Sequence, residues 1–188
     1  MNRDNKPREI RLIALDLDGT LLNTEKRLTD RSRDALARAA AAGIEIVPTT
    51  GRFFDGMPEA VRNLPFLRYA VTINGAAVFD VKRGDNLMKA ELPPEQALRI
   101  LEDLEGLPVL FDCYQDNAGW MSRSMWERVE DFVDLPYARR LVRETRRPIP
   151  DLTAMLRARG RGVQTASGEL EKVQTLSPFK GADWDIDK

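Results

Sequence analysis

The fold of this chain is decided near its start, by the stretch LIALDLDGT at residues 12–20. Its first four residues are apolar, as expected of a short strand that is buried on both faces of a parallel sheet. The strand ends in Asp16 and Asp18, which the two-residue period of a strand points in the same direction. Gly19 then turns the chain, and Thr20 adds a hydroxyl group beside the carboxylates.

Two carboxylates at the end of a strand lie where open α/β sheets bind their ligands. Like charges this close repel each other unless a cation or a proton lies between them. The pair Asp16 and Asp18 therefore indicates a metal site, in which one acid is the nucleophile and the other the proton donor. A solvated acidic turn would not need an apolar strand leading into it. A calcium loop is excluded, because it requires Gly at its sixth position, whereas Gly19 is the fourth residue counted from Asp16.

The composition narrows the chemistry that the chain supports. Its 188 residues suffice for one domain, or for one domain and part of another. Histidine is absent from the sequence, which excludes Ser-His-Asp and Cys-His catalysis and histidine-ligated zinc. The single cysteine, Cys113, has no internal disulfide partner, and Gly119 stands where a cysteine-phosphatase loop needs arginine. Carboxylate chemistry is therefore favoured.

The same counts bear on partners and location. The net charge is −1, so no overall charge draws the chain to nucleic acid or to an anionic membrane. Residues 1–9 form a polar tail without a signal-peptide core, and no apolar run is as long as a membrane span. Together with the single cysteine, these features predict a cytoplasmic protein with no nucleic-acid or membrane partner. The sequence does not indicate the oligomeric state.

A second strand ending adds polar groups to the first. A helix over about residues 29–42 and a short apolar strand over 44–47 lead to Thr50, Gly51 and Arg52. The Thr50 hydroxyl and nearby backbone N–H groups can donate hydrogen bonds to phosphoryl oxygens, and Gly51 lets the backbone approach closely. Arg52 either contacts a substrate phosphate or pairs with a carboxylate near the site, and both interpretations stay open.

These two strand endings resemble the first two motifs of the haloacid dehalogenase (HAD) superfamily of phosphotransferases. The D-x-D-G-T pattern at 16–20 is similar to the first motif, and the Thr-Gly-Arg at 50–52 is typical of the Cof-type, sugar-phosphatase-like branch (subfamily IIB). A third apolar strand at 69–73 ends in Asn74 and Gly75, and Cof-type proteins carry a matching Asn-Gly near the active-site mouth. Because Asn-Gly is also a strong hairpin signal, Asn74 is expected in a hairpin and, by resemblance, beside the substrate.

The resemblance implies an α/β fold, with a Rossmann-like HAD core of parallel sheet and flanking helices and an inserted α/β cap of the C2 type. Residues 10–81, which carry the specific motifs, are expected to form the N-terminal part of the core, and residues 82–188 the cap. Within the cap, the sequence predicts an amphipathic helix from 94, strands at 109–114 and from 120, helices at 122–133 and 151–160, and a strand at 171–176.

Two groups of cap residues allow more than one interpretation. A basic run is favoured as a solvated face, with a phosphate-binding or nucleic-acid patch as the alternative. It contains Arg139, Arg140, Arg143, Arg146 and Arg147. Tyr114, Trp120 and Trp126 are favoured as cap core over sugar-stacking groups, and Cys113 as a small core residue.

Two parts of the HAD pattern are not identifiable, namely a lysine after the cap and an acidic strand end that completes the metal site. The tail at 180–187 offers a lysine and three acids, but no apolar strand precedes the acids. We therefore interpret the chain as a member that is truncated at its C-terminus and holds half a core and most of a cap. Without the missing partner strand, residues 12–15 are expected at an open sheet edge.

The resemblance also implies an enzyme with two working acids. Asp16 is expected to attack phosphorus and form an aspartyl-phosphate, and Asp18 to protonate the leaving oxygen and then activate water. Mg²⁺ is expected as the cofactor, held by Asp16 and by Asp18, the latter through its carbonyl. The residues expected to bind the substrate phosphate are Thr50, Gly51, Arg52 and Asn74.

The favoured function is therefore a Mg²⁺-dependent phosphatase that acts on a small phosphorylated metabolite, with a sugar phosphate as the favoured substrate. A phosphomutase is a related alternative. The missing motifs leave a third interpretation open, that of a catalytically impaired module that binds a phosphorylated metabolite or interacts with a protein.

Overall fold

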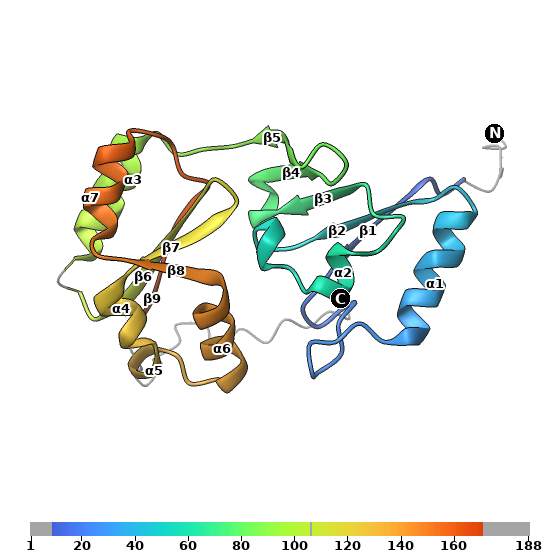
Figure 1. Ribbon diagram of the computed structural model, residues 1–188, viewed down its shortest axis with the longest axis horizontal. Coiled ribbons are helices and arrows are strands. Elements are labelled where there is room, and N and C mark those ends of the chain that lie inside the picture. The colour runs from blue at the N-terminus through green and yellow to red at the C-terminus, as the bar shows by residue number, and fades with distance from the viewer. Residues whose placement is uncertain (1–8, 106, 171–188) are drawn as a thin grey trace, which may run out of the picture.

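The computed structural model describes residues 9–105 and 107–170, which form two lobes that each surround one sheet (Figure 1). The first lobe holds a five-stranded sheet of order β1-β2-β3-β4-β5, and the second a four-stranded sheet of order β8-β7-β6-β9. Helices flank both sheets, so the expected α/β fold is confirmed. Within the described ranges, no helix is both long enough and apolar enough to span a membrane.

The first lobe is built on the parallel pair that the sequence predicts. Its elements are β1 (Leu12–Asp16), α1 (Asp30–Ala41), β2 (Glu45–Thr49), α2 (Glu59–Arg62), β3 (Tyr69–Thr72), β4 (Ala77–Asp80) and β5 (Asp85–Lys89). α1 begins where the Thr29 side chain accepts a hydrogen bond from the Ser32 N–H, at 3.2 Å. β1 and β2 run parallel in the register that pairs Asp16 with Thr49, so both strands end at the same edge of the sheet.

The expected hairpin forms after β3. β3 and β4 pair antiparallel, and a 3₁₀ turn over Ile73–Gly75 connects them. Asn74 (φ +53°) and Gly75 (φ +94°) occupy left-handed backbone conformations, which these residue types adopt more readily than most. β5 then adds to β4, so the first sheet extends beyond residue 81, the expected end of the core. We therefore place the boundary between the lobes after β5.

β1 lies at one edge of the first sheet as described. Leu12 is 53% exposed, and Ala14 is also exposed. The expectation of a strand buried on both faces is therefore wrong. The sequence predicted that β1 would lie at an open edge, because a further partner strand was not identifiable. Within the described residues, β1 lies at such an edge.

The turn that follows β1 is anchored by burial. Leu17 is fully buried, and Leu21 and Leu22 pack in the same apolar cluster as Phe54 and Val61. Burying one leucine side chain contributes about 2 kcal/mol to folding. Asp16 and Asp18, on either side of Leu17, are exposed. The apolar residue between them thus holds both acids at the surface.

The second lobe has helices on both faces of its sheet. Its elements are α3 (Pro94–Leu104), β6 (Val109–Gln115), β7 (Ala118–Ser122), α4 (Arg123–Glu127), α5 (Val129–Phe132), α6 (Pro136–Thr145), β8 (Arg146–Ile149), α7 (Leu152–Arg159) and β9 (Thr165–Leu170). α3 and α7 pack together over one face, and α4 to α6 cover the other (Figure 1). Cys113 is buried beneath α3 and α7, and burial raises the pKa of its thiol to about 12, which fits its expected role as a core residue.

Some details of the second lobe differ from the sequence expectation. The helix expected over 122–133 is interrupted at Arg128, which separates α4 from α5. The Ser122 hydroxyl makes no capping bond and instead accepts a hydrogen bond from the Leu152 N–H, at 3.0 Å. β9 was not predicted, and the strand expected at 171–176 lies outside the described residues, as does the tail at 180–187.

The cap of α7 gives a test of this local structure. The Asp151 side chain accepts a hydrogen bond from the Ala154 N–H at 2.9 Å, and this bond is the main reason that the pKa of Asp151 lies below its ordinary value. We expect Asp151→Ala to lower the free energy of unfolding by about 1 kcal/mol at neutral pH, measured by urea denaturation.

The stabilisation by Asp151 should depend on pH in a defined direction. A carboxyl whose pKa is lowered by folding stabilises the protein above its unfolded-state pKa, and the effect is lost as the pH falls through the folded-state pKa. The difference between wild type and Asp151→Ala should therefore shrink in acid. Asp151→Asn keeps a neutral acceptor and should show little such dependence. An equal difference for Asp151→Ala at neutral and acidic pH would contradict this account.

Candidate active site

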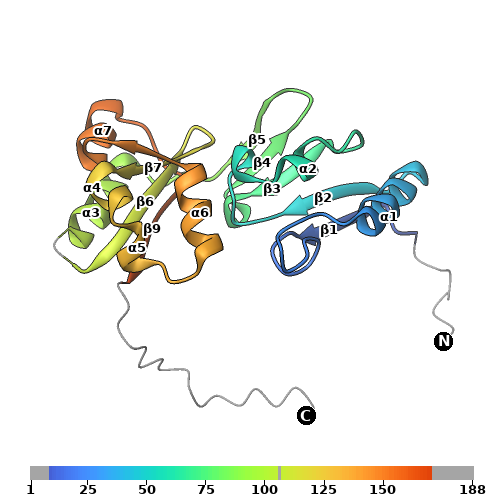
Figure 2. The same ribbon diagram turned by 60° about the horizontal axis from the view of Figure 1, so that its bottom comes forward.

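The candidate active site lies where β1 and β2 end, on the side of the first lobe that faces α6 (Figure 2). A cavity of about 280 Å³ is found there, and both lobes line it. Five residues singled out from the sequence share it, namely Asp16, Asp18, Thr50, Gly51 and Arg52. Asn74 lines an adjoining hollow together with Asp16, Thr50 and Gly51. The structure thus brings all six expected residues to one region.

Asp18 is paired with two cations. Arg52 donates from Nε and Nη2 to the two carboxylate oxygens, each at 2.9 Å, and the Lys26 Nζ lies 3.2 Å from Oδ1. The hydrogen bonds from Arg52 are the main reason that the pKa of Asp18 lies below its ordinary value. Partial burial acts in the opposite direction and raises the pKa. Asp18 is therefore ionised in this arrangement. The structure shows Arg52 paired with a carboxylate, which was one of its two expected roles. Contact between Arg52 and the substrate stays a prediction.

Asp16 has a different environment from Asp18. It is exposed, and among the described residues its carboxylate forms no ion pair. The Thr20 hydroxyl donates a long hydrogen bond to Oδ2, at 3.5 Å. The two acids therefore differ in their surroundings, because the Asp16 carboxylate is free to bind a ligand whereas the Asp18 carboxylate is held by Arg52 and Lys26.

The end of β2 presents a hydroxyl group that is fixed in place. Thr50 is buried, and its Oγ1 accepts a hydrogen bond from the Arg52 N–H at 3.2 Å, which leaves the hydroxyl proton available to donate. A Cβ atom at Gly51 would lie 2.8 Å from the Asn74 Oδ1. Only glycine at this position allows the Asn74 side chain to pack against the backbone.

Two residues of the second lobe line this cavity although the sequence predicted other surroundings for them. Arg146 was expected on a solvated face and Tyr114 in the cap core. Arg146 pairs with Asp112 at 2.5 Å and donates to the Tyr114 hydroxyl, and its side chain is only 13% exposed. Parallel pairing of β7 and β8 brings Arg146 beside Gly119, where a Cβ atom would lie 2.8 Å from the Arg146 Cδ. No sequence signal marks this long-range pairing.

The two lobes contact each other directly beside the cavity. The rings of Phe53 and Tyr114 meet edge to face, with centroids 5.2 Å apart. The Phe54 N–H donates to the Asn117 Oδ1 at 2.9 Å. In a third contact, the Lys26 Nζ lies 4.9 Å from the centroid of the Tyr137 ring on α6. Lys26 thus contacts both Asp18 and the second lobe.

The oxygen donors of the site suit Mg²⁺, which in proteins often takes one or two carboxylates together with substrate phosphate and water. Asp16 offers a free carboxylate. The Asp18 carboxylate is occupied by Arg52 and Lys26, which leaves the backbone carbonyl that the resemblance implies. Within the described ranges, no cluster of three or more acidic, histidine or cysteine side chains could hold a metal ion. The donors therefore fit an ion whose coordination the substrate helps to complete.

Comparison with known proteins shows the family to which the chain belongs. Residues 13–150 match the family model of the haloacid dehalogenase-like hydrolases. The chain belongs to this family. A 5-amino-6-(5-phospho-D-ribitylamino)uracil phosphatase of Bacillus subtilis is 33% identical over 96 residues, which are 51% of this chain and 38% of the relative. A pyridoxal phosphate phosphatase of Escherichia coli is 35% identical over 108 residues, 57% of this chain and 40% of the relative.

The structural comparisons extend the likeness to both lobes. A HAD-like hydrolase of Bacillus subtilis superposes with a TM-score of 0.64 at 22% identity, covering 82% of this chain and 59% of that one. A HAD subclass IIB sugar phosphatase gives 0.60 at 17% identity, covering 81% and 56%. At these identities the likeness shows the fold. The chain spans about two fifths of the length of the two curated relatives.

The pairing of Asp18 can be tested by titration. We expect Arg52→Ala to raise the pKa of Asp18, because the variant loses the two hydrogen bonds that favour the ionised form. The titration can be followed by the chemical shift of the carboxyl carbon in protein labelled with ¹³C-aspartate. Arg62→Ala, which removes a guanidinium that pairs with Asp55 instead, is the control. An unchanged Asp18 midpoint in Arg52→Ala would contradict the assignment.

Proposed function

We propose that the chain is a Mg²⁺-dependent phosphatase that hydrolyses a small phosphorylated metabolite through an aspartyl-phosphate on Asp16. The observation that carries this proposal is the contrast between the two acids on one cavity wall. Asp16 has a free carboxylate, whereas the Asp18 carboxylate is held by Arg52 and Lys26. Membership of a hydrolase family, with phosphatases among the curated relatives, supports it.

In the first step, an Asp16 oxygen forms a bond to phosphorus as the bond between phosphorus and the ester oxygen breaks. The leaving oxygen takes a proton, which Asp18 supplies when it is protonated. In the second step, Asp18 takes a proton from water, which attacks phosphorus and releases Asp16. The ionised Asp18 of the structure corresponds to the start of this second step, because only an ionised carboxylate can accept a proton. Arg52 and Lys26 hold Asp18 in that state, although they also weaken it as a base.

The remaining expected residues would hold the phosphoryl group. The Thr50 hydroxyl and the backbone N–H groups around Gly51 would donate to its oxygens, and Asn74 would donate from its side-chain amide. Mg²⁺ held by Asp16 and the Asp18 carbonyl would supply positive charge to the same oxygens. Phosphoryl transfer depends chiefly on such positioning and electrostatics.

The second lobe would determine which substrate fits. Tyr114 and Arg146 line the cavity over the acids, so a docked second lobe would exclude water and contact the part of the substrate beyond the phosphate. A sugar phosphate is the substrate class that we favour, with support from the sugar phosphatase among the similar folds. A cytoplasmic location remains part of this proposal.

One observation favours a second candidate function. The described residues offer Mg²⁺ a single free carboxylate, and no third acid joins the pair. A module that binds a phosphorylated metabolite without hydrolysing it would need no more than this. Binding without release of phosphate distinguishes this candidate from a phosphatase.

Phosphate release from a panel of sugar phosphates in the presence of Mg²⁺ tests the proposal. We expect Asp16→Asn to lower the rate by about a thousandfold or more, because the amide is a poor nucleophile. Removal of Mg²⁺ with a chelator should have a comparable effect. Asp34→Asn, on the exposed surface of α1, should leave the rate unchanged. Equal rates for wild type and Asp16→Asn would contradict the proposal.

A further inference from the structure

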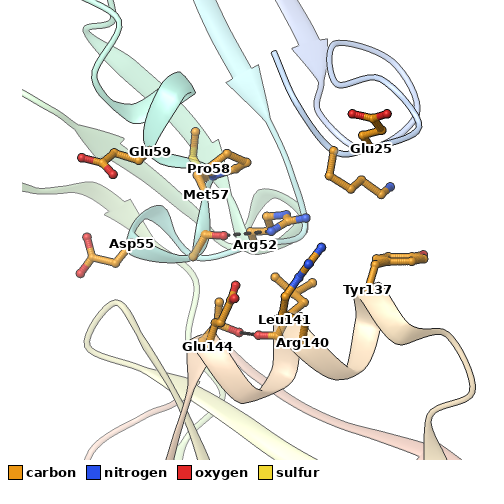
Figure 3. Close-up of a pocket in the computed structure, with 13 residues that line it drawn as sticks. Glu25, Arg52, Asp55, Met57, Pro58, Glu59, Tyr137, Arg140, Leu141 and Glu144 are labelled. Carbon is orange, nitrogen blue, oxygen red and sulfur yellow. Dashed lines mark hydrogen bonds between the residues drawn. The ribbon is translucent and has the colours of Figure 1, made fainter. Parts of the chain in front are cut away.

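A second cavity, of about 350 Å³, adjoins the candidate active site (Figure 3). It lies between the first lobe and α6, and it shares lining residues with the first cavity. The shared residues are Arg52, Gly56, Leu141 and Thr145. A substrate whose phosphoryl group lies at Asp16 therefore has room for the rest of the molecule in this second cavity.

Arg140 stands apart from the other arginines of the basic run. The other four have partners: Arg139 with the Val133 carbonyl, Arg143 with Glu130, Arg146 with Asp112, and Arg147 with the Trp120 ring. Arg140, on α6, forms no hydrogen bond, ion pair or ring contact with any residue that the structure describes. The run is therefore not a uniform solvated face, and its unpaired guanidinium lines the second cavity.

The charges around this cavity favour an anion near Arg140. In Figure 3 the Arg140 side chain extends from α6 toward Arg52, whereas the carboxylates of Asp55, Glu59 and Glu25 point away from it. Asp55 and Glu25 have arginine partners elsewhere. Arg52 is already paired with Asp18, so Arg140 is the guanidinium of this cavity that an anionic group of a ligand can pair with. The planar fork of arginine matches a carboxylate or a phosphate.

A second unpaired group suggests what else the ligand carries. Glu144 lies one turn after Arg140 on α6 and lines the same cavity. Among the described residues it has no hydrogen-bonding or ionic partner, so its carboxylate is free to accept hydrogen bonds from hydroxyl groups. The cavity thus combines a donor for an anion with an acceptor for hydroxyls.

We propose that Arg140 binds a second anionic group on the substrate, and that the substrate is a phosphorylated polyol with a carboxylate or a further phosphate. Glu144 accepts hydrogen bonds from the hydroxyls. This inference rests on the proposed function and refines its substrate class. The anionic group occupies the second cavity while the reacting phosphoryl group lies between Asp16 and Thr50.

Two matched pairs of compounds test the role of Arg140. Sorbitol 6-phosphate and 6-phosphogluconate differ by a carboxylate, and fructose 6-phosphate and fructose 1,6-bisphosphate differ by a phosphate. We expect wild type to favour the more anionic member of at least one pair by about tenfold in kcat/KM. Arg140→Ala should abolish this preference and change the rate for the less charged member by about twofold at most. Which pair shows the preference identifies the anionic group.

Variants and a binding measurement separate the possible failures. Arg140→Lys should keep part of the preference, and Arg99→Ala, an exposed arginine on α3, should keep all of it. Titration calorimetry with Asp16→Asn should give the same order of affinities without turnover. Equal treatment of both members of each pair by wild type, or a preference that survives in Arg140→Ala, overturns the inference alone. If none of the four compounds is bound or hydrolysed, the proposed function is overturned as well.

Discussion

The parallel pairing of β1 and β2 is the constraint on which the site depends. It ends both strands at one edge and so brings two acids from one strand beside a threonine and an arginine from the next. The bidentate ion pair between Arg52 and Asp18 then connects the two strand ends by side chains. Because Leu17 is buried between the two acids, neither can turn inward without exposing it. Strand register, one buried leucine and one ion pair thus bring the two acids beside Thr50 and Arg52.

The ion pair matters more for the state of Asp18 than for the stability of the fold. Asp18 is about one third exposed, and an ion pair at such a site contributes little to folding because water screens it. Its chemical effect is larger, since Arg52 and Lys26 hold one acid ionised while Asp16, two residues away, stays free. Lys26 also lies against the Tyr137 ring of the second lobe. Lys26 therefore both stabilises the charge on Asp18 and takes part in the contact between the lobes.

The sequence was most informative where structure is local. The strands that end near Asp16 and Thr50, the helix starts near residues 29 and 151 and the Asn74-Gly75 turn each depend on a few neighbouring residues, and all are observed. What escaped prediction depends on pairing between distant segments. β5 joins the first sheet through its register with β4, and β8 brings Arg146 over the acids through its register with β7. The partners of the basic run likewise come from other elements, so its sequence alone could not distinguish Arg140 from its neighbours.

The central claim is that Asp16 itself becomes phosphorylated, and the most direct measurement is to locate the phosphoryl group on the chain. The protein would be mixed with a phosphorylated substrate and Mg²⁺, quenched in acid and reduced with borohydride, which converts an aspartyl-phosphate to homoserine. The account predicts homoserine at position 16 by peptide mass spectrometry, and an unmodified Asp18. Release of phosphate with no modification at Asp16, or with the modification at Asp18, would contradict it.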